Sequence, residues 1–202
     1  MGIFLKAIHD QNTRLSSKYS DRILKLFIGI SSAYIYEKRE ARKPNTNTIK
    51  YNLVKLGHEL GFRVYANGLT SEQSREQFEK YGFVNREFLY DVHWYVDKKG
   101  EFYTPEDVPL VVESELGDRR KNDTSKLRSP AIKFDFQKLL FANADLRLMI
   151  FKTKNLQHLN EINLYFEKAI ESFRLLEKGS AFLFICFVHD TKELYYSEKN
   201  KQ

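Results

Sequence analysis

Two glutamates two positions apart, Glu113 and Glu115, are the residues of this sequence best suited to chemistry. They directly follow the apolar run at residues 110–112, which is typical of a buried strand. Side chains alternate between the two faces of a strand, so Glu113 and Glu115 are predicted to share a face. Neighbouring carboxylates repel each other, and a bound divalent cation removes that cost. Mg²⁺ prefers such oxygen ligands, usually one or two carboxylates completed by water and a substrate phosphate.

A third acidic candidate is Asp91, which lies in the middle of an aromatic and β-branched segment at residues 88–96. Acidic residues are uncommon in strands of this composition. If this strand pairs with the strand of Glu113, the carboxylates meet at one point. A cation held there would polarise a phosphoryl oxygen and activate a water, which suits phosphodiester hydrolysis. A second interpretation stays open, in which Glu113 and Glu115 face solvent and Asp91 pairs with a neighbouring Lys or Arg.

Three aromatic candidates have simpler explanations. His93 shares the predicted face of Asp91, but a lone histidine on a strand is usually packed or hydrogen-bonded. His58 is predicted to be exposed. Trp94 and its aromatic neighbours are predicted to belong to the core rather than to a surface that stacks on nucleobases.

The elements that must position these residues follow from hydrophobic periodicity and capping signals. Helices are predicted from Ser20 onward, at 49–60, 71–81 and 131–143, and from Asn155 to a stop at Gly179. Strands are predicted at 62–66, 88–96, 108–115, 146–151 and 181–188, with an edge strand at 194–197. This pattern indicates a single α/β domain, in which residues 1–47 form an N-terminal helical extension and residues 48–202 form the α/β core.

The order helix, three strands, helix, strand over residues 49–152 resembles the common core of the PD-(D/E)XK nuclease superfamily. In that family an aspartate near the start of the second core strand and an acidic-x-Lys motif on the third strand bind the metal. Asp91 matches the first position, and Glu113-Ser114-Glu115 matches the motif with Glu in place of Lys. Some restriction enzymes carry Glu-x-Glu at this place. Glu59, on the helix that opens the core, matches an acidic position that assists metal binding in some members.

Other members of the superfamily carry the motif lysine on the following helix. Lys138 lies beside the apolar stripe of the helix predicted here at 131–143 and could reach back to the site. There it would orient a water or stabilise charge developing on the phosphate. An equally simple role for Lys138 is a surface pair with Asp135, three residues earlier.

The resemblance implies a restriction-endonuclease-like fold, with a mixed central sheet flanked by helices, and a Mg²⁺-dependent endonuclease acting on DNA. Mn²⁺ is expected to substitute for Mg²⁺. It implies Asp91, Glu113, Glu115 and Glu59 as metal ligands, and Asp91, Glu113, Glu115 and Lys138 as catalytic residues. The alternative is a catalytically degenerate nuclease-fold module that binds nucleic acid or a protein partner. Glu115 in place of the usual Lys is the reason for considering it.

The composition fits a polyanionic partner. The 202 residues include 33 Lys and Arg against 27 Asp and Glu, a formal net charge of +6, and neutralising phosphates releases counterions. The segments 38–43 and 118–128 are candidates for phosphate contacts. The one cysteine, Cys186, is predicted to be a core residue. No signal peptide or membrane span is evident, so a soluble cytoplasmic protein without a membrane partner is expected. The sequence leaves a homodimer open.

Overall fold

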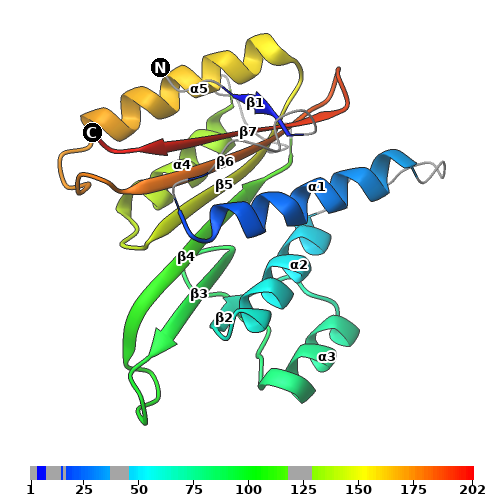
Figure 1. Cartoon of the computed structure of the whole chain (residues 1–202), viewed down its shortest axis with the longest axis vertical. Helices are drawn as coiled ribbons and strands as arrows, with labels where there is room; N and C mark the ends of the chain where they lie inside the picture. Colours follow the sequence, from blue (N-terminus) through cyan, green and yellow to red (C-terminus); the bar gives the residue numbers. More distant parts are fainter. Residues whose placement is uncertain (1–3, 8–14, 16, 37–45, 118–128) are drawn as a thin grey trace.

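A seven-stranded mixed sheet organises the chain (Figure 1), in the order β1-β7-β6-β5-β4-β3-β2. The computed structural model describes residues 4–7, 15, 17–36, 46–117 and 129–202. Within them the strands are β1 (Leu5–Lys6), β2 (Arg63–Ala66), β3 (Val92–Asp97), β4 (Pro105–Glu115), β5 (Leu146–Thr153), β6 (Ala181–Val188) and β7 (Glu193–Asn200). The helices are α1 (Ser20–Tyr36), α2 (Thr46–Glu59), α3 (Ser71–Tyr81), α4 (Pro130–Phe141) and α5 (Leu156–Ser172). The predicted α/β class is therefore confirmed.

The sheet is antiparallel at both edges and parallel in its middle. β2, β3 and β4 pair in antiparallel fashion, whereas β4, β5 and β6 are parallel. Parallel neighbours need a crossover connection, which α4 supplies between β4 and β5 and α5 between β5 and β6. Beyond β6 the sheet continues with β7 and ends with β1, and both strands are antiparallel to their neighbours. This arrangement sets the end of β4 beside the start of β3.

The two faces of the sheet carry separate cores. On one face, α1 and α2 cover side chains such as Leu110, Val112 and Trp94. On the other face, α4 and α5 pack against alternate residues such as Val111 and Met149. This alternation is the period-two pattern of a sheet that is buried on both sides. Side chains at successive positions of β4 therefore reach opposite helix layers.

Helix α3 and strand β6 begin and end at the predicted residues. The N-cap of α3, Thr70, accepts a hydrogen bond from the backbone N–H of Gln73, whose side chain accepts one from Thr70 in return. Trp94 is fully buried, and its Nε1 donates to the carbonyl of Leu53 at 3.1 Å, so the core assignment is confirmed. Cys186 is also fully buried, as predicted, and burial raises the pKa of its thiol to about 12.

Several elements differ from the sequence prediction. Helix α5 ends at Ser172, with Phe173 as its C-cap, rather than at Gly179. β3 starts at Val92 rather than at residue 88, because the chain turns tightly at Leu89 with a positive φ of 53°. β1 was not predicted, because a strand of two residues is too short to show an alternating pattern. β1 pairs with the outer side of β7, so β7, which was predicted to be an edge strand, lies inside the sheet. The N-terminal part of the chain therefore contributes a strand as well as a helix. Among the described helices, none is long and apolar enough to cross a membrane.

The approach of α2 to β3 depends on Gly57. A Cβ at this position would lie 2.5 Å from Trp94 Nε1 and 2.8 Å from Val64 Cγ2, so Gly57→Ala should overpack the core. We expect this change to lower the free energy of unfolding by about 1–3 kcal/mol, measured by urea denaturation. Gly29→Ala on α1 is the matched control, because nothing lies within 4 Å of its added Cβ. It should be neutral or stabilising by about 0.5–1 kcal/mol. Equal effects at the two positions would contradict the described helix packing.

Candidate functional site

Asp91 directly precedes β3, and Glu113 lies near the end of β4. The antiparallel register pairs Val92 with Val112, so one step further along the ladder brings Asp91 opposite Glu113. Oδ2 of Asp91 accepts two hydrogen bonds from Ser114, at 2.9 Å from the backbone N–H and 2.6 Å from Oγ. These bonds fix the carboxylate of Asp91 to β4. The two acids were predicted to meet at one point. The register makes them neighbours, and the charge of Asp91 acts on Glu113, but their bonds run to opposite helix layers, from Asp91 to Lys50 of α2 and from Glu113 to Lys138 of α4.

Lys50 of α2 approaches Asp91 from the face of the sheet that α1 and α2 cover. Its Nζ lies 2.8 Å from Oδ1 of Asp91 and 2.6 Å from Oδ1 of Asn67. The lysine is buried, with 7% of its surface exposed. Lys50 was not predicted at the site, although helical spacing could have indicated that it is buried. It precedes Leu53 and Val54 by three and four residues, so helical spacing sets it on the buried stripe of α2.

Lys138 of α4 approaches Glu113 from the opposite helix layer. Its Nζ lies 3.1 Å from Oε2 of Glu113 and 3.0 Å from Oδ1 of Asp135. The two contacts that the sequence offered as alternatives are therefore present together. Burial alone would lower the pKa of Lys138, but the bonds to Asp135 and Glu113 outweigh it and raise the pKa. The ammonium group thus stays charged over the physiological range.

The carboxyl group of Glu113 is the most perturbed acid described at this site. Its side chain is almost fully buried, and Oε1 has no hydrogen-bond partner among the described residues. Burial, and then the charge of Asp91, raise the pKa of Glu113 to about 8, and Lys138 offsets this only in part. The carboxyl group is therefore largely protonated at neutral pH although Lys138 lies within ion-pair distance. A cation beside Oε1 would favour the ionised form.

Glu115 makes a local bond, whereas Glu59 lies away from the site. Oε1 of Glu115 accepts a hydrogen bond from the backbone N–H of Gly117 at 2.7 Å. Glu59 is exposed at the far end of α2, about 13 Å along the helix from Lys50, where its charge acts on Lys80. The structure does not bring Glu59 to the site, because the N-terminal half of α2 faces Asp91. Among the described residues, no three Asp, Glu, His or Cys side chains gather to hold a metal ion. Asp91 and Glu113 remain as a pair of carboxylates.

The two histidines are both buried. His58 was predicted to be exposed, and this was wrong: its ring stacks on Tyr81 at 4.5 Å, and Nδ1 lies 2.9 Å from Gln77 Oε1. The cause is α3, which covers this part of α2. His93 packs against Tyr65 and Phe88 with both ring centroids 5.1 Å away. Burial lowers the pKa of His93 to about 4, so its ring is neutral at physiological pH.

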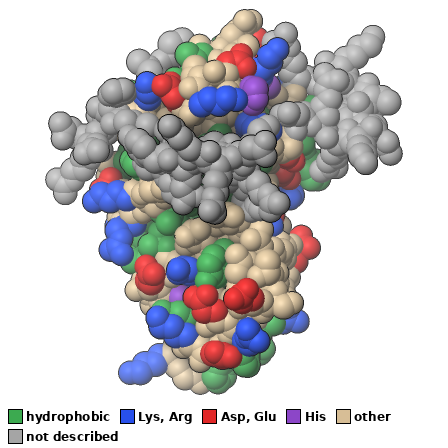
Figure 2. Space-filling view, turned by 90° about the vertical axis from the view of Figure 1, so that its right-hand side faces the viewer, with side chains coloured by type: hydrophobic (Ala, Val, Ile, Leu, Met, Phe, Trp, Pro, Cys, Tyr) green, Lys and Arg blue, Asp and Glu red, His purple; other side chains and the backbone are tan. Residues whose placement is uncertain are grey.

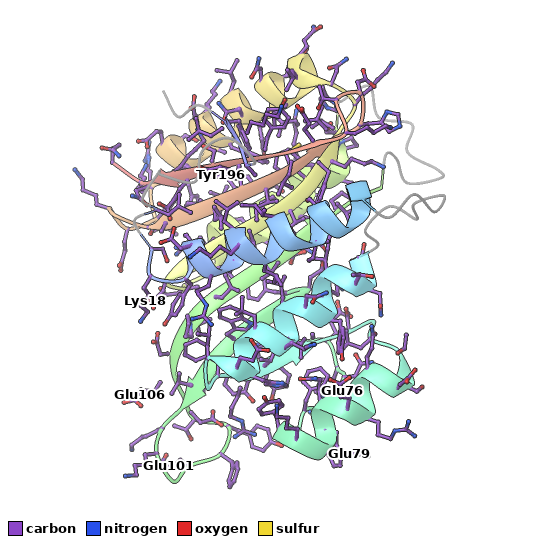
Figure 3. The ribbon with its side chains drawn as sticks, turned by 45° about the vertical axis from the view of Figure 1, so that its right-hand side comes forward. Lys18, Glu76, Glu79, Glu101, Glu106 and Tyr196 are labelled. Atoms are coloured by element: carbon purple, nitrogen blue, oxygen red, sulfur yellow. The ribbon has the colours of Figure 1, made fainter. Side chains whose placement is uncertain are left out.

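The described surface mixes charges of both signs. On the face drawn in Figure 2, acidic and basic side chains are interspersed below the undescribed residues. Figure 3 places Glu76 and Glu79 on α3, and Glu101 and Glu106 on the hairpin between β3 and β4, all toward the lower end of the molecule. The predicted phosphate-contacting segments 38–43 and 118–128 lie outside the described residues. Within the described part, Lys50 and Lys138 supply positive charge directly beside the carboxylates.

No protein-family model matches this chain, and neither a curated protein nor a solved structure matches it. Any functional conclusion therefore depends on the chemistry of the site itself.

The raised pKa of Glu113 predicts a pH dependence of stability. The folded protein holds this proton up to a pKa of about 8, whereas the unfolded chain releases it near 4.5. Between these values the unfolded state binds fewer protons, so stability is highest at the acidic end and falls as pH rises through 8. Glu113→Gln removes this loss, which amounts to a few kcal/mol at about 1.4 kcal/mol per pKa unit. The melting temperature of the variant should therefore fall less than that of the wild type between about pH 5 and about pH 9.

The exposed acid Glu106 on β4 provides the control for this measurement. Glu106→Gln should follow the wild-type pH profile. If Glu113→Gln also follows it, Glu113 is not a proton-binding group of the folded protein in this range.

Proposed function

We propose that the protein is a metal-dependent nuclease that hydrolyses phosphodiester bonds in DNA. The observation that carries the proposal is the buried carboxyl group of Glu113, with Oε1 lacking a partner among the described residues, beside Asp91. A buried carboxylate next to another acid is costly unless a cation compensates it. Such a pair at a strand junction is therefore better explained as a cation site than as a stabilising feature.

The topology around this pair supports a restriction-endonuclease-like core. Helix α2 is followed by the antiparallel strands β2, β3 and β4, and α4 then crosses over to the parallel strand β5. The acids stand at the start of the second of these strands and near the end of the third. Both positions agree with the resemblance to the PD-(D/E)XK superfamily.

The residues present fit a hard divalent cation with few protein ligands. Asp91 and Glu113 would hold Mg²⁺ or Mn²⁺, and Mg²⁺ sites commonly use only one or two carboxylates. The ion would polarise a phosphoryl oxygen and lower the pKa of a water molecule. Lys138, charged and 3.1 Å from Glu113, would stabilise the negative charge that develops on the phosphate. Lys50, now bonded to Asp91, would exchange that contact for one with a phosphate oxygen.

The direct test is cleavage of DNA by an Asp91→Asn variant in the presence of Mn²⁺. We expect cleavage to be abolished, as it should be when EDTA is added to the wild type, because the amide supplies no anionic ligand. Asn can still accept the hydrogen bonds from Ser114, so the variant should stay folded. The control is Asp107→Asn, which changes an exposed aspartate on the same hairpin and should leave the rate unchanged. Persistent cleavage by Asp91→Asn would overturn the proposed site.

Lys138 provides a second, graded test of the same chemistry. Lys138→Ala should reduce the cleavage rate by roughly 100- to 1000-fold, the scale lost with one donor to the transition state. Lys138→Arg should rescue only part of it, because the guanidinium group has a different geometry. Lys133→Ala is the matched control on the same helix, since Nζ of Lys133 lies over the ring of Tyr165, 4.9 Å from its centroid. Small and equal losses at both lysines would show that Lys138 only pairs with Asp135.

One observation favours a second candidate function. Both carboxylate oxygens of Asp91 are already bonded, Oδ1 to Lys50 and Oδ2 to Ser114. A charge network of this kind can hold α2 and β4 together without a metal. In that case the chain is a catalytically degenerate module that binds nucleic acid or a protein partner, and it would not bind a cation at Asp91.

A further inference from the structure

An exposed apolar pair, Phe88 and Leu89, stands directly before the site. Phe88 is 51% exposed and Leu89 is 70% exposed, and only Tyr90 separates them from Asp91. Leu89 has a φ of 53°, a backbone conformation that is costly for a bulky residue. The turn is closed by a hydrogen bond from the N–H of Tyr90 to the carbonyl of Phe88 at 2.5 Å. The chain therefore accepts strain at a point where two large apolar side chains are held in solvent.

Aromatic neighbours pack against one face of the Phe88 ring. It stacks on Tyr65 with centroids 5.2 Å apart and planes 20° apart, and Tyr65 in turn stacks on Tyr95 at 4.9 Å. His93 fills the space beside them, and its Nδ1 is buried without a hydrogen-bond partner among the described residues. One side of Phe88 is thus fixed, while half of the residue remains open to a ligand.

Positive charge accompanies this column of rings. The guanidinium group of Arg63 lies 5.6 Å from the centroid of Tyr95 and 5.4 Å from that of Phe102. It also pairs with Asp97 at 2.6 Å, and about half of the arginine side chain stays exposed. At the other end, the ring of Tyr90 lies 6.2 Å from that of His93, and Tyr90 directly precedes Asp91, so the column leads to the acidic residues of the site. Rings for stacking and cations for phosphates are together the features that bind single-stranded nucleic acid.

We propose that Phe88 and Leu89, the apolar tip, bind an unpaired nucleobase and make the protein selective for single-stranded or locally unpaired DNA. This inference rests on the proposed nuclease function and names its substrate class. The base would stack on the open side of Phe88, with its own phosphate near Asp91. In duplex DNA the bases are already stacked on their neighbours. Leu89 would then act as a wedge, as apolar side chains do when they separate base steps.

Binding in EDTA tests the inference without any dependence on cleavage. Fluorescence anisotropy would compare a short single-stranded oligodeoxynucleotide with its blunt duplex, using the wild type, Phe88→Ala, Phe88→Trp and Leu89→Ala. We expect the wild type to prefer the single strand and Phe88→Ala to lose about tenfold in affinity for it. Phe88→Trp should retain that affinity, and Leu89→Ala should lower it less. A 2-aminopurine base in the single strand should be quenched by the wild type but not by Phe88→Ala.

Phe78→Ala is the matched control, because Phe78 is 58% exposed on α3. It should leave binding unchanged, and melting temperatures would verify that each variant is folded. Equal wild-type affinity for the two DNA forms, or equal binding by Phe88→Ala and Phe78→Ala, would overturn the role of the tip while leaving the nuclease proposal standing. If the wild type binds neither DNA form in EDTA, the role of the tip fails, whereas the nuclease proposal is still tested by cleavage with Mn²⁺.

Discussion

The burial of the Glu113 carboxyl group beside Asp91 is the constraint on which the site depends. An acid that loses its hydration must be protonated, paired or bound to a cation. Lys138 lies at 3.1 Å, yet burial and the charge of Asp91 still raise the pKa of Glu113 to about 8. Compensation by this chain alone is therefore incomplete. A divalent cation beside Oε1 would complete it by favouring the ionised form of Glu113.

The sheet topology creates this constraint and also partly relieves it. Because β4 has helices over both faces, Ser114 bonds to Asp91 while the adjacent Glu113 bonds to Lys138 of α4. Lys50 reaches Asp91 from α2, in the other layer. Two lysines from opposite layers thus converge on neighbouring acids. The crossover that makes β4 and β5 parallel is what returns α4 over the end of β4.

Local patterns predicted those parts of the site that depend on one element. The strand containing Glu113 and the reach of Lys138 followed from an apolar run and from the helix after it. Lys50 escaped notice because its partner Asp91 lies 41 positions away, a separation that periodicity does not address. Glu59 was expected at the site from the resemblance, but the direction of α2 carries it away from Asp91. The turn at Leu89 was hidden because residues 88–90 contain no Gly, Pro or Asn to mark it.

Binding of Mn²⁺ measured by titration calorimetry in two buffers of different ionisation enthalpy tests the central claim most directly. If Asp91 and Glu113 form one cation site, the metal-free protein should bind a single Mn²⁺ at about neutral pH and release the proton held by Glu113. The observed enthalpy would then differ between the buffers, and the difference should disappear in Glu113→Gln. Absence of binding, or binding with the same enthalpy in both buffers, would contradict a cation site built on the buried acid.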